Sequence, residues 1–226
     1  MNYYILAAKK DIGCPASLVE LAILYDRFYE AKVARKTEHG LLYPWYARNK
    51  KGMRSLADDS VLIAKCRLID FDIRKLISNI FIVSENFVEL MTKVGLKFQD
   101  LREIEVVSSL GEVISKKKYF AAIFENSNTF DLNLHIDKDL SKTEKDIDNR
   151  IYFKNIYIKN NGLPDLFSFS GMNPTQNFLF CTENFKFAAE AGGIKGVEWM
   201  LSSQINWPDN PMVQSLRDPG SLFIQI

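Results

Sequence analysis

The sequence NIFIVSENFVELMTKVGLK, residues 79–97, reads as a buried strand, a capped helix and a helix stop. Residues 81–83 form a short apolar run, which is typical of a strand covered on both faces. Ser84 stands where the N-cap of a helix belongs, because its hydroxyl can accept a hydrogen bond from an N–H of the first turn. Gly95 can adopt the left-handed conformation that ends a helix.

The same pattern recurs in NFLFCTENFKFAAEAGGIK, residues 177–195, which is 177 − 79 = 98 positions later. Thr182 replaces Ser84 at the cap, and Glu-Asn-Phe follows in both copies. The glutamate falls in the first turn, where the helix dipole stabilises negative charge. Two copies are too few for a solenoid, so the pattern predicts a duplicated structural unit. Chance recurrence of a common strand-helix pattern is the alternative.

Each predicted helix is followed by a further strand, at residues 101–107 and 197–201. Other apolar or alternating runs predict strands at residues 2–8, 118–124, 131–136 and 151–158. We therefore predict an α+β fold, with a mixed or mostly antiparallel sheet, a few packed helices and two related strand-helix-strand units. No linker stands out in composition, so we expect one domain over residues 1–226, with two lobes at about 1–110 and 111–226 as a subdivision.

The segment that begins at Pro15 predicts a further helix, because proline is favoured in the first helical turn. Apolar residues then recur at helical spacing up to about Arg35. They are Leu18, Leu21, Ala22, Tyr25, Phe28 and Tyr29. Residues 61–69 read as either a strand or a short helix.

The composition excludes several classes of protein. The net charge of +1 does not favour nonspecific binding to nucleic acid, which depends on neutralising phosphates. No apolar stretch approaches the ~20 residues of a membrane span, and no signal peptide is visible. Three widely spaced cysteines fit reduced thiols better than a disulfide framework. We therefore expect a cytoplasmic protein.

The aromatic piece at residues 41–46 lies beside Arg48, Lys50, Lys51 and Arg54. Such a mixture can form a stacking surface for single-stranded nucleic acid. The alternative, which we favour, is a loop whose aromatic side chains anchor it to the core.

The segment DKDLSKTEKDIDNR, residues 137–150, is polar and dense in charges of both signs. A solvated loop or an exposed short helix is the plainest interpretation. The functional alternative is an acidic flap that faces a partner. A further segment, NWPDNP at residues 206–211, is punctuated by prolines.

Candidates for catalysis are few. His135 and Asp137 are two positions apart in a predicted strand, so they would share one sheet face, and such a pair can orient a general base. No nucleophile in a sharp-turn motif accompanies them. The cysteines lack paired spacing, and two histidines cannot close a zinc site without carboxylates. Residues 192–196 are rich in glycine but follow a helix, whereas phosphate loops open one. The sequence thus predicts no enzyme, no cofactor and no metal.

These motifs resemble a known family, the immunity proteins of bacterial polymorphic toxin systems, in the α+β group once catalogued as a domain of unknown function. The resemblance covers roughly residues 80–201. It rests on Tyr3-Tyr4-Ile5-Leu6, on both copies of the doubled unit, on Glu105-Val106-Val107, and on Tyr119-Phe120 with Asp131 downstream. The family often carries an aspartate pair after the position of Tyr119, and this chain keeps only Asp131.

The resemblance implies a cytoplasmic antidote that binds one cognate toxin domain and has no catalysis of its own. The alternative is a small-ligand-binding protein or enzyme that uses His135, Asp137 and the aromatic residues 43–46. The oligomeric state is left open. For the toxin contact we expect the charged flap and the proline-punctuated segment. The contact residues would be Asp137, Asp139, Glu144, Asp146, Asp148 and Trp207.

Overall fold

The computed structural model describes residues 2–18, 21–29, 56–77, 80–145, 151–159, 162–172 and 178–204. The strands are β1 (Tyr3–Ala8), β2 (Ala22–Tyr25), β3 (Val61–Ala64), β4 (Ile73–Ile77), β5 (Ile80–Ser84), β6 (Phe98–Ser108), β7 (Tyr119–Phe124), β8 (Thr129–Asp131), β9 (Thr143–Lys145), β10 (Ile151–Phe153), β11 (Leu166–Ser170), β12 (Leu179–Thr182) and β13 (Val197–Leu201). The helices are α3 (Glu85–Lys93), α4 (Leu132–His135) and α5 (Glu183–Ala191), with short 3-10 turns η1 (Asn126–Asn128) and η3 (Ser202–Gln204).

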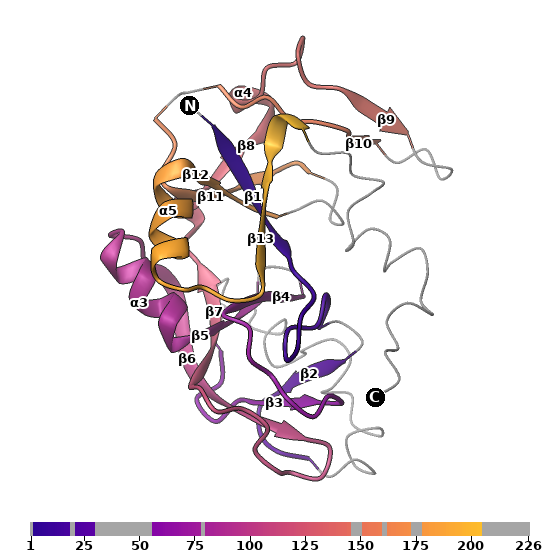
Figure 1. The fold of residues 1–226 in the computed structure, drawn as a ribbon, viewed down its shortest axis with the longest axis vertical. Coiled ribbons are helices and arrows are strands. Elements are labelled where there is room, and N and C mark those ends of the chain that lie inside the picture. The colour runs from indigo at the N-terminus through magenta and orange to yellow at the C-terminus, as the bar shows by residue number, and fades with distance from the viewer. Residues whose placement is uncertain are drawn as a thin grey trace, which may run out of the picture.

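The strands form two large sheets and a hairpin. One sheet has the order β2-β3-β6-β7-β5-β4, the other the order β13-β1-β12-β11-β8, and β9 pairs with β10. Only the pairs β3/β6 and β11/β8 are parallel among the described strands. Figure 1 shows the sheet of β1 above that of β7, with α3 and α5 on one flank where the sheets meet. The predicted α+β class with mixed, mostly antiparallel sheets is confirmed.

Both helices of the doubled unit begin at the predicted caps. Ser84 Oγ accepts the N–H of Phe87 at 3.3 Å, and Thr182 Oγ1 accepts the N–H of Phe185 at 3.4 Å. These bonds satisfy N–H groups that have no partner within the helix. Each helix then packs its phenylalanine inward, and both rings are completely buried.

Both helices also end at the predicted glycines. Gly95 and Gly193 have φ of +72° and +65°, the left-handed region that glycine tolerates. The chain reversal lets the N–H of Leu96 reach the carbonyl of Met91 at 2.9 Å, and the equivalent bond after α5 is 3.0 Å. This six-to-one bond is the Schellman closure of a helix.

The repeated unit is larger than the sequence pattern indicates, because each copy also has an aspartate behind its cap. The Ser84 hydroxyl donates to the Asp72 carboxylate, and the Thr182 hydroxyl donates to that of Asp165. The backbone agrees, since each cap N–H donates to the carbonyl of the same aspartate, at 2.9 and 3.0 Å. The strand after each aspartate, β4 or β11, pairs antiparallel with the strand that carries the cap.

A fourth strand completes each copy, and it comes from a different place in the chain. β7 lies between β5 and β6, and β1 lies between β12 and β13, antiparallel to both neighbours in each case. Tyr119 pairs with Ser84 as Tyr3 pairs with Thr182. The middle strand therefore follows the unit in one copy and precedes it in the other. The two copies are structurally equivalent motifs related by circular permutation.

Buried polar groups join the two sheets. Asp72 is 0% exposed, and besides Ser84 it binds Lys117 Nζ at 3.0 Å and the backbone N–H of Lys195 at 2.6 Å. Arg74, also buried, donates to four backbone carbonyls from both parts of the fold. These belong to Lys9, Pro15, Ile73 and Gly196. Desolvation lowers the pKa of Arg74 to about 10, so it stays charged at neutral pH.

The helix predicted over residues 15–35 is wrong for the described part of that segment. Ala22–Tyr25 is strand β2, paired antiparallel with β3 through Ala22↔Ala64 and Tyr25↔Val61. A short apolar run fits either period, and here the pairing with β3 decides for the strand. For residues 61–69, left open between strand and helix, the structure has the strand Val61–Ala64.

Two other expected strands are shorter than predicted. The strand at residues 131–136 is wrong from Leu132 onward, because the Asp131 carboxylate accepts the N–H of Asn133 at 2.8 Å and starts the one-turn helix α4. Of residues 151–158, only Ile151–Phe153 is a strand, and Ile158 forms an isolated bridge to Ile136. The division of the chain into one domain with two lobes stays a prediction.

Candidate functional site

The charged segment begins with a turn that Asp137 organises. One oxygen of its carboxylate accepts the N–H groups of Asp139 and Leu140 at 3.0 and 3.2 Å. Its own N–H donates to the carbonyl of Tyr157 at 2.8 Å. An aspartate that bonds the backbone two residues ahead is a common turn former, so Asp137 has a structural task here.

Residues 138–142 form a mostly exposed turn, as the loop interpretation expects, and residues 143–145 are strand β9, which pairs with β10. Thr143 pairs with Phe153 and Glu144 with Tyr152. The Asn155 side chain supports the entry by accepting the N–H of Lys142 at 2.7 Å. Of the predicted contact residues, Asp137 and Asp139 are described in full, and Glu144 is placed by its backbone. Asp146, Asp148 and Trp207 lie outside the described residues.

Three apolar side chains are exposed beside these acidic groups. Leu134 is 66% exposed, Leu140 55% and Tyr157 36%. Together with Asp137 and Asp139 they make up what we call the flap surface. Apolar groups inside a polar rim are typical of protein interfaces. Leu140 lies inside the charged run at residues 137–150, a signal that could have revealed it, whereas Leu134 lies just before that run and carries no such signal.

The structure does not bring His135 and Asp137 together as a catalytic pair. His135 ends α4, and its ring lies between those of Phe130 and Phe169, with centroid distances of 5.3 and 6.5 Å. Its Nδ1 is buried without a hydrogen-bond partner in the described part of the chain. The expected placement on one sheet face is wrong, because Asp131 starts a helix there. The aromatic residues 43–46 lie outside the described residues.

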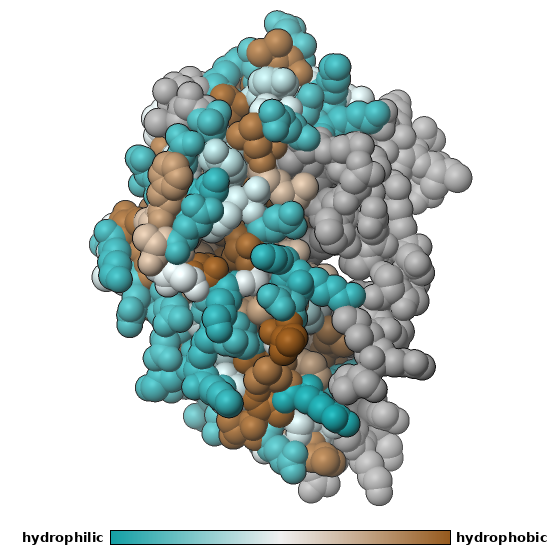
Figure 2. All heavy atoms as spheres, in the orientation of Figure 1, coloured by the Kyte–Doolittle hydropathy of each residue, from teal (hydrophilic) through white to brown (hydrophobic). Residues whose placement is uncertain are grey.

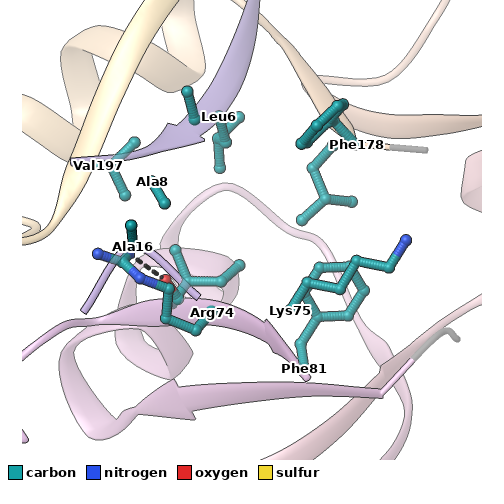
Figure 3. Close-up of a pocket in the computed structure, with 11 residues that line it drawn as sticks. Leu6, Ala8, Ala16, Arg74, Lys75, Phe81, Phe178 and Val197 are labelled. Carbon is teal, nitrogen blue, oxygen red and sulfur yellow. Dashed lines mark hydrogen bonds between the residues drawn. The ribbon is translucent and has the colours of Figure 1, made fainter. Parts of the chain in front are cut away.

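Two adjoining cavities lie between the sheets. The smaller, of about 40 Å³, is lined by Leu6 and Val197 on one side and by Arg74 and Phe81 on the other. Figure 3 shows the Arg74 guanidinium beside Ala16, while Lys75 extends away toward the Phe178 side. A space of this size holds one or two waters.

The larger cavity has a volume of about 260 Å³ and shares Lys75, Phe81 and Phe178 with the smaller one. Hydroxyls of Thr129, Ser168 and Ser170 add polar groups to its wall. Burial lowers the pKa of Lys75 to about 8. No group of three or more His, Cys, Asp or Glu side chains suited to a metal ion occurs among the described residues.

The helices that the structure describes are all too short or too polar to cross a membrane. The three cysteines carry no disulfide, and Cys14 and Cys181 are buried.

Comparison with known proteins adds the decisive observation. The model of the family named Immunity protein 43 matches residues 22–206, which is 206 − 22 + 1 = 185 of the 226 residues. The chain belongs to the Immunity protein 43 family. A search of the curated proteins finds no significant match. The resemblance drawn from the sequence is therefore confirmed at the level of the family.

The Immunity protein 43 match covers all of the first copy and most of the second. It begins at β2, so β1, the middle strand of the second copy, precedes the matched range. Asp131, which remains of the expected aspartate pair, caps α4 and accepts an N–H from Asn133. The carboxylate that this chain keeps therefore starts a helix.

Proposed function

We propose that this protein neutralises a cognate bacterial toxin domain by binding it in the cytoplasm of the producing cell, without catalysing a reaction. The single observation that carries the proposal is membership of the Immunity protein 43 family over 185 residues. A protein that inhibits by occupation needs a stable complementary surface, and interfaces of this kind commonly bury ~1,600 Å² in total.

The flap surface is one proposed contact with the toxin. Leu134, Leu140 and Tyr157 supply apolar area that the fold itself leaves in water. Asp137 already fixes the turn beneath them through two backbone N–H groups, so little conformational freedom is lost on binding. Asp146, Asp148 and Trp207 are proposed to extend this contact.

The test of the function is protection. The gene upstream is expected to encode a large secreted protein with a variable C-terminal toxin domain. Co-expression of that domain with this protein should restore growth, and the two should co-purify. A toxin domain that kills equally in the presence of the protein, and shows no binding by calorimetry, would refute the proposed function.

The test of the flap uses two variants and a matched control. Leu140→Asp and the pair Asp146→Ala with Asp148→Ala should each weaken toxin binding by at least about 10-fold, as is common when an interface anchor is removed. Phe187→Asp is the control, because Phe187 is 56% exposed on α5, away from the flap in sequence and in the sheet order. Unchanged affinity in both flap variants would exclude this surface.

A further inference from the structure

A second exposed apolar surface lies where three loops meet, far from the flap. The N–H of Asp70 donates to the carbonyl of Gly13 at 2.8 Å, which joins the loop after β1 to the loop after β3. The N–H of Ile69 donates to the carbonyl of Ile114 at 3.3 Å, which joins the second loop to the segment before β7. The three loops therefore form one continuous surface.

Ile12 is held outward at the tip of a tight turn. Asp11 and Cys14 exchange backbone hydrogen bonds of 3.1 and 2.8 Å across this turn, and the N–H of Ile12 donates to the Asp11 carboxylate at 2.7 Å. The turn packs closely against Asp70, because a Cβ built on Gly13 would lie only 2.9 Å from the Asp70 Cβ. Even so, Ile12 is 84% exposed. A rigid, exposed isoleucine can act as an anchor at low entropic cost.

Neighbouring residues widen the apolar area. Val113 is 69% exposed and precedes Ile114, while Leu68 is partly exposed and lies 3.2 Å from the position of a Cβ on Gly13. Figure 2 shows hydrophobic atoms gathered in a strip on the lower half of this face. Scattered apolar residues are ordinary, but a continuous patch with a polar rim marks an interaction site. We call Ile12, Leu68 and Val113, with the cations described next, the loop patch.

The rim of the loop patch is basic. Lys10, Lys65, Arg67 and Lys116 are exposed and form no ion pair with any residue that the structure describes. The nearby carboxylate of Asp70 is already held between Lys117 and Lys195, each at 2.9 Å. The same loops also carry the exposed carboxylates of Asp11 and Glu112, so the four cations exceed them by 4 − 2 = 2 charges, against +1 for the whole chain.

We propose that the loop patch binds a second face of the cognate toxin domain, distinct from the one that meets the flap, and that this face is acidic with an apolar recess for Ile12. The proposal rests on the proposed function and names the chemistry of the partner surface. The aliphatic centre favours a protein over a single-stranded nucleic acid, whose bases are usually stacked on aromatic side chains. The cations would steer the encounter and set orientation, and Ile12 would supply the buried anchor.

The experiment measures toxin affinity for the wild type, Ile12→Asp and Lys10→Glu/Arg67→Glu at about 50 and 300 mM NaCl, where screening differs strongly. Each variant should bind at least about 30-fold more weakly at low salt, since an anchor or a charge pair is lost. The charge-reversed variant should also lose most of the salt dependence. Lys93→Glu/Lys97→Glu, which reverses two exposed lysines around the end of α3, and Phe187→Asp are the matched controls.

Each outcome is decisive. A wild type that protects cells and binds, with loop-patch variants that bind equally well, would overturn the loop patch and leave the proposed function standing. A wild type that neither protects nor binds would refute the proposed function itself. Salt-dependent binding of a DNA or RNA oligonucleotide that the variants lose, while toxin affinity is unchanged, would assign the patch to nucleic acid and overturn the proposal. Circular dichroism of every variant confirms that the fold is intact.

Discussion

The ring centroids of Phe87 and Phe185 lie 6.3 Å apart in an edge-to-face contact, although these residues occupy the same position in the two copies of the repeated unit. The two helices therefore meet through equivalent side chains. Contact between equivalent residues is the hallmark of an isologous interface, which is usually found between subunits. Here it lies within one chain and holds the two sheets together on the flank that α3 and α5 cover (Figure 1).

This contact should be visible as a coupling energy. Phe87→Leu and Phe185→Leu, combined in a double-mutant cycle, are expected to show an interaction of about 1 kcal/mol, because each ring loses its aromatic partner. Urea unfolding of the four proteins measures it. Leu132→Ala, in the separate cluster of the β8 end, is the control and should add to Phe87→Leu within about 0.5 kcal/mol. Strict additivity of the two phenylalanine changes would contradict the prediction.

Asp72 and Asp165, the aspartates that accept hydrogen bonds from the two N-cap hydroxyls, should differ in their contribution to stability. Asp72→Asn should lower the free energy of unfolding by about 2 to 3 kcal/mol, because a fully buried carboxylate loses bonds to Ser84, Lys117 and Lys195. Asp165→Asn is the matched change in the other copy. It should cost only about 1 kcal/mol, because Asp165 is partly exposed and its loss removes only the support of the Thr182 helix cap. Equal losses of unfolding free energy in the two variants would show that the bonds of Asp72 to Lys117 and Lys195 add nothing to stability.

Gly196 is expected to tolerate no side chain. It has φ of +78°, and a Cβ there would lie 3.0 Å from both Arg74 Nη2 and Phe71 Cβ. Gly196→Ala should therefore cost clearly more than the ~1 to 2 kcal/mol of a left-handed alanine, since Arg74 must also leave its carbonyls. Gly193→Ala separates the two effects, because Gly193 has φ of +65° with no atom within 4 Å of the added carbon. Thermal unfolding of both variants gives the comparison.

Asp70 should make stability depend on pH in the acid range. Hydrogen bonds from Lys117, and then from Lys195, lower the pKa of Asp70 below its ordinary value of 3.8. A lowered folded-state pKa stabilises the fold above the unfolded value, and this contribution is lost as the pH falls through the folded value. The difference in unfolding free energy between wild type and Asp70→Asn should thus be constant near neutral pH and shrink below about pH 4. A difference that grows on acidification would contradict this assignment.

Much of the fold could be predicted from local chemistry. Ser84 and Thr182 cap helices, and Gly95 and Gly193 end them, because those residue types satisfy or permit one particular backbone geometry. Local chemistry could not reveal that β1 and β7 play the same part, since a strand's neighbours are set by pairing across the chain. The same limit explains the helix predicted at residues 15–35, where pairing with β3 overrides an ambiguous apolar spacing.

The candidate surfaces depend more on the folded structure. The charged run at residues 137–150 predicts Asp137 as a toxin contact, which stays a prediction, and the structure shows that its carboxylate fastens a turn. Ile12 escaped notice because a single isoleucine in a polar loop carries no pattern. Its significance comes from 84% exposure on a turn held by three hydrogen bonds, and exposure is a property of the folded molecule alone.

The permuted order of the second copy has a consequence for how the molecule is made. Tyr3 pairs with Thr182, which is 182 − 3 = 179 positions later. At ~5 to 20 residues per second on the ribosome, β1 emerges roughly 9 to 36 s before its partner exists. The copy built around β7 can fold as it is synthesised. In the other copy, the apolar strand β1 stays unpaired until β12 and β13 have been made. A newly translated molecule thus becomes complete late, at a moment dictated by elongation rather than by thermodynamics.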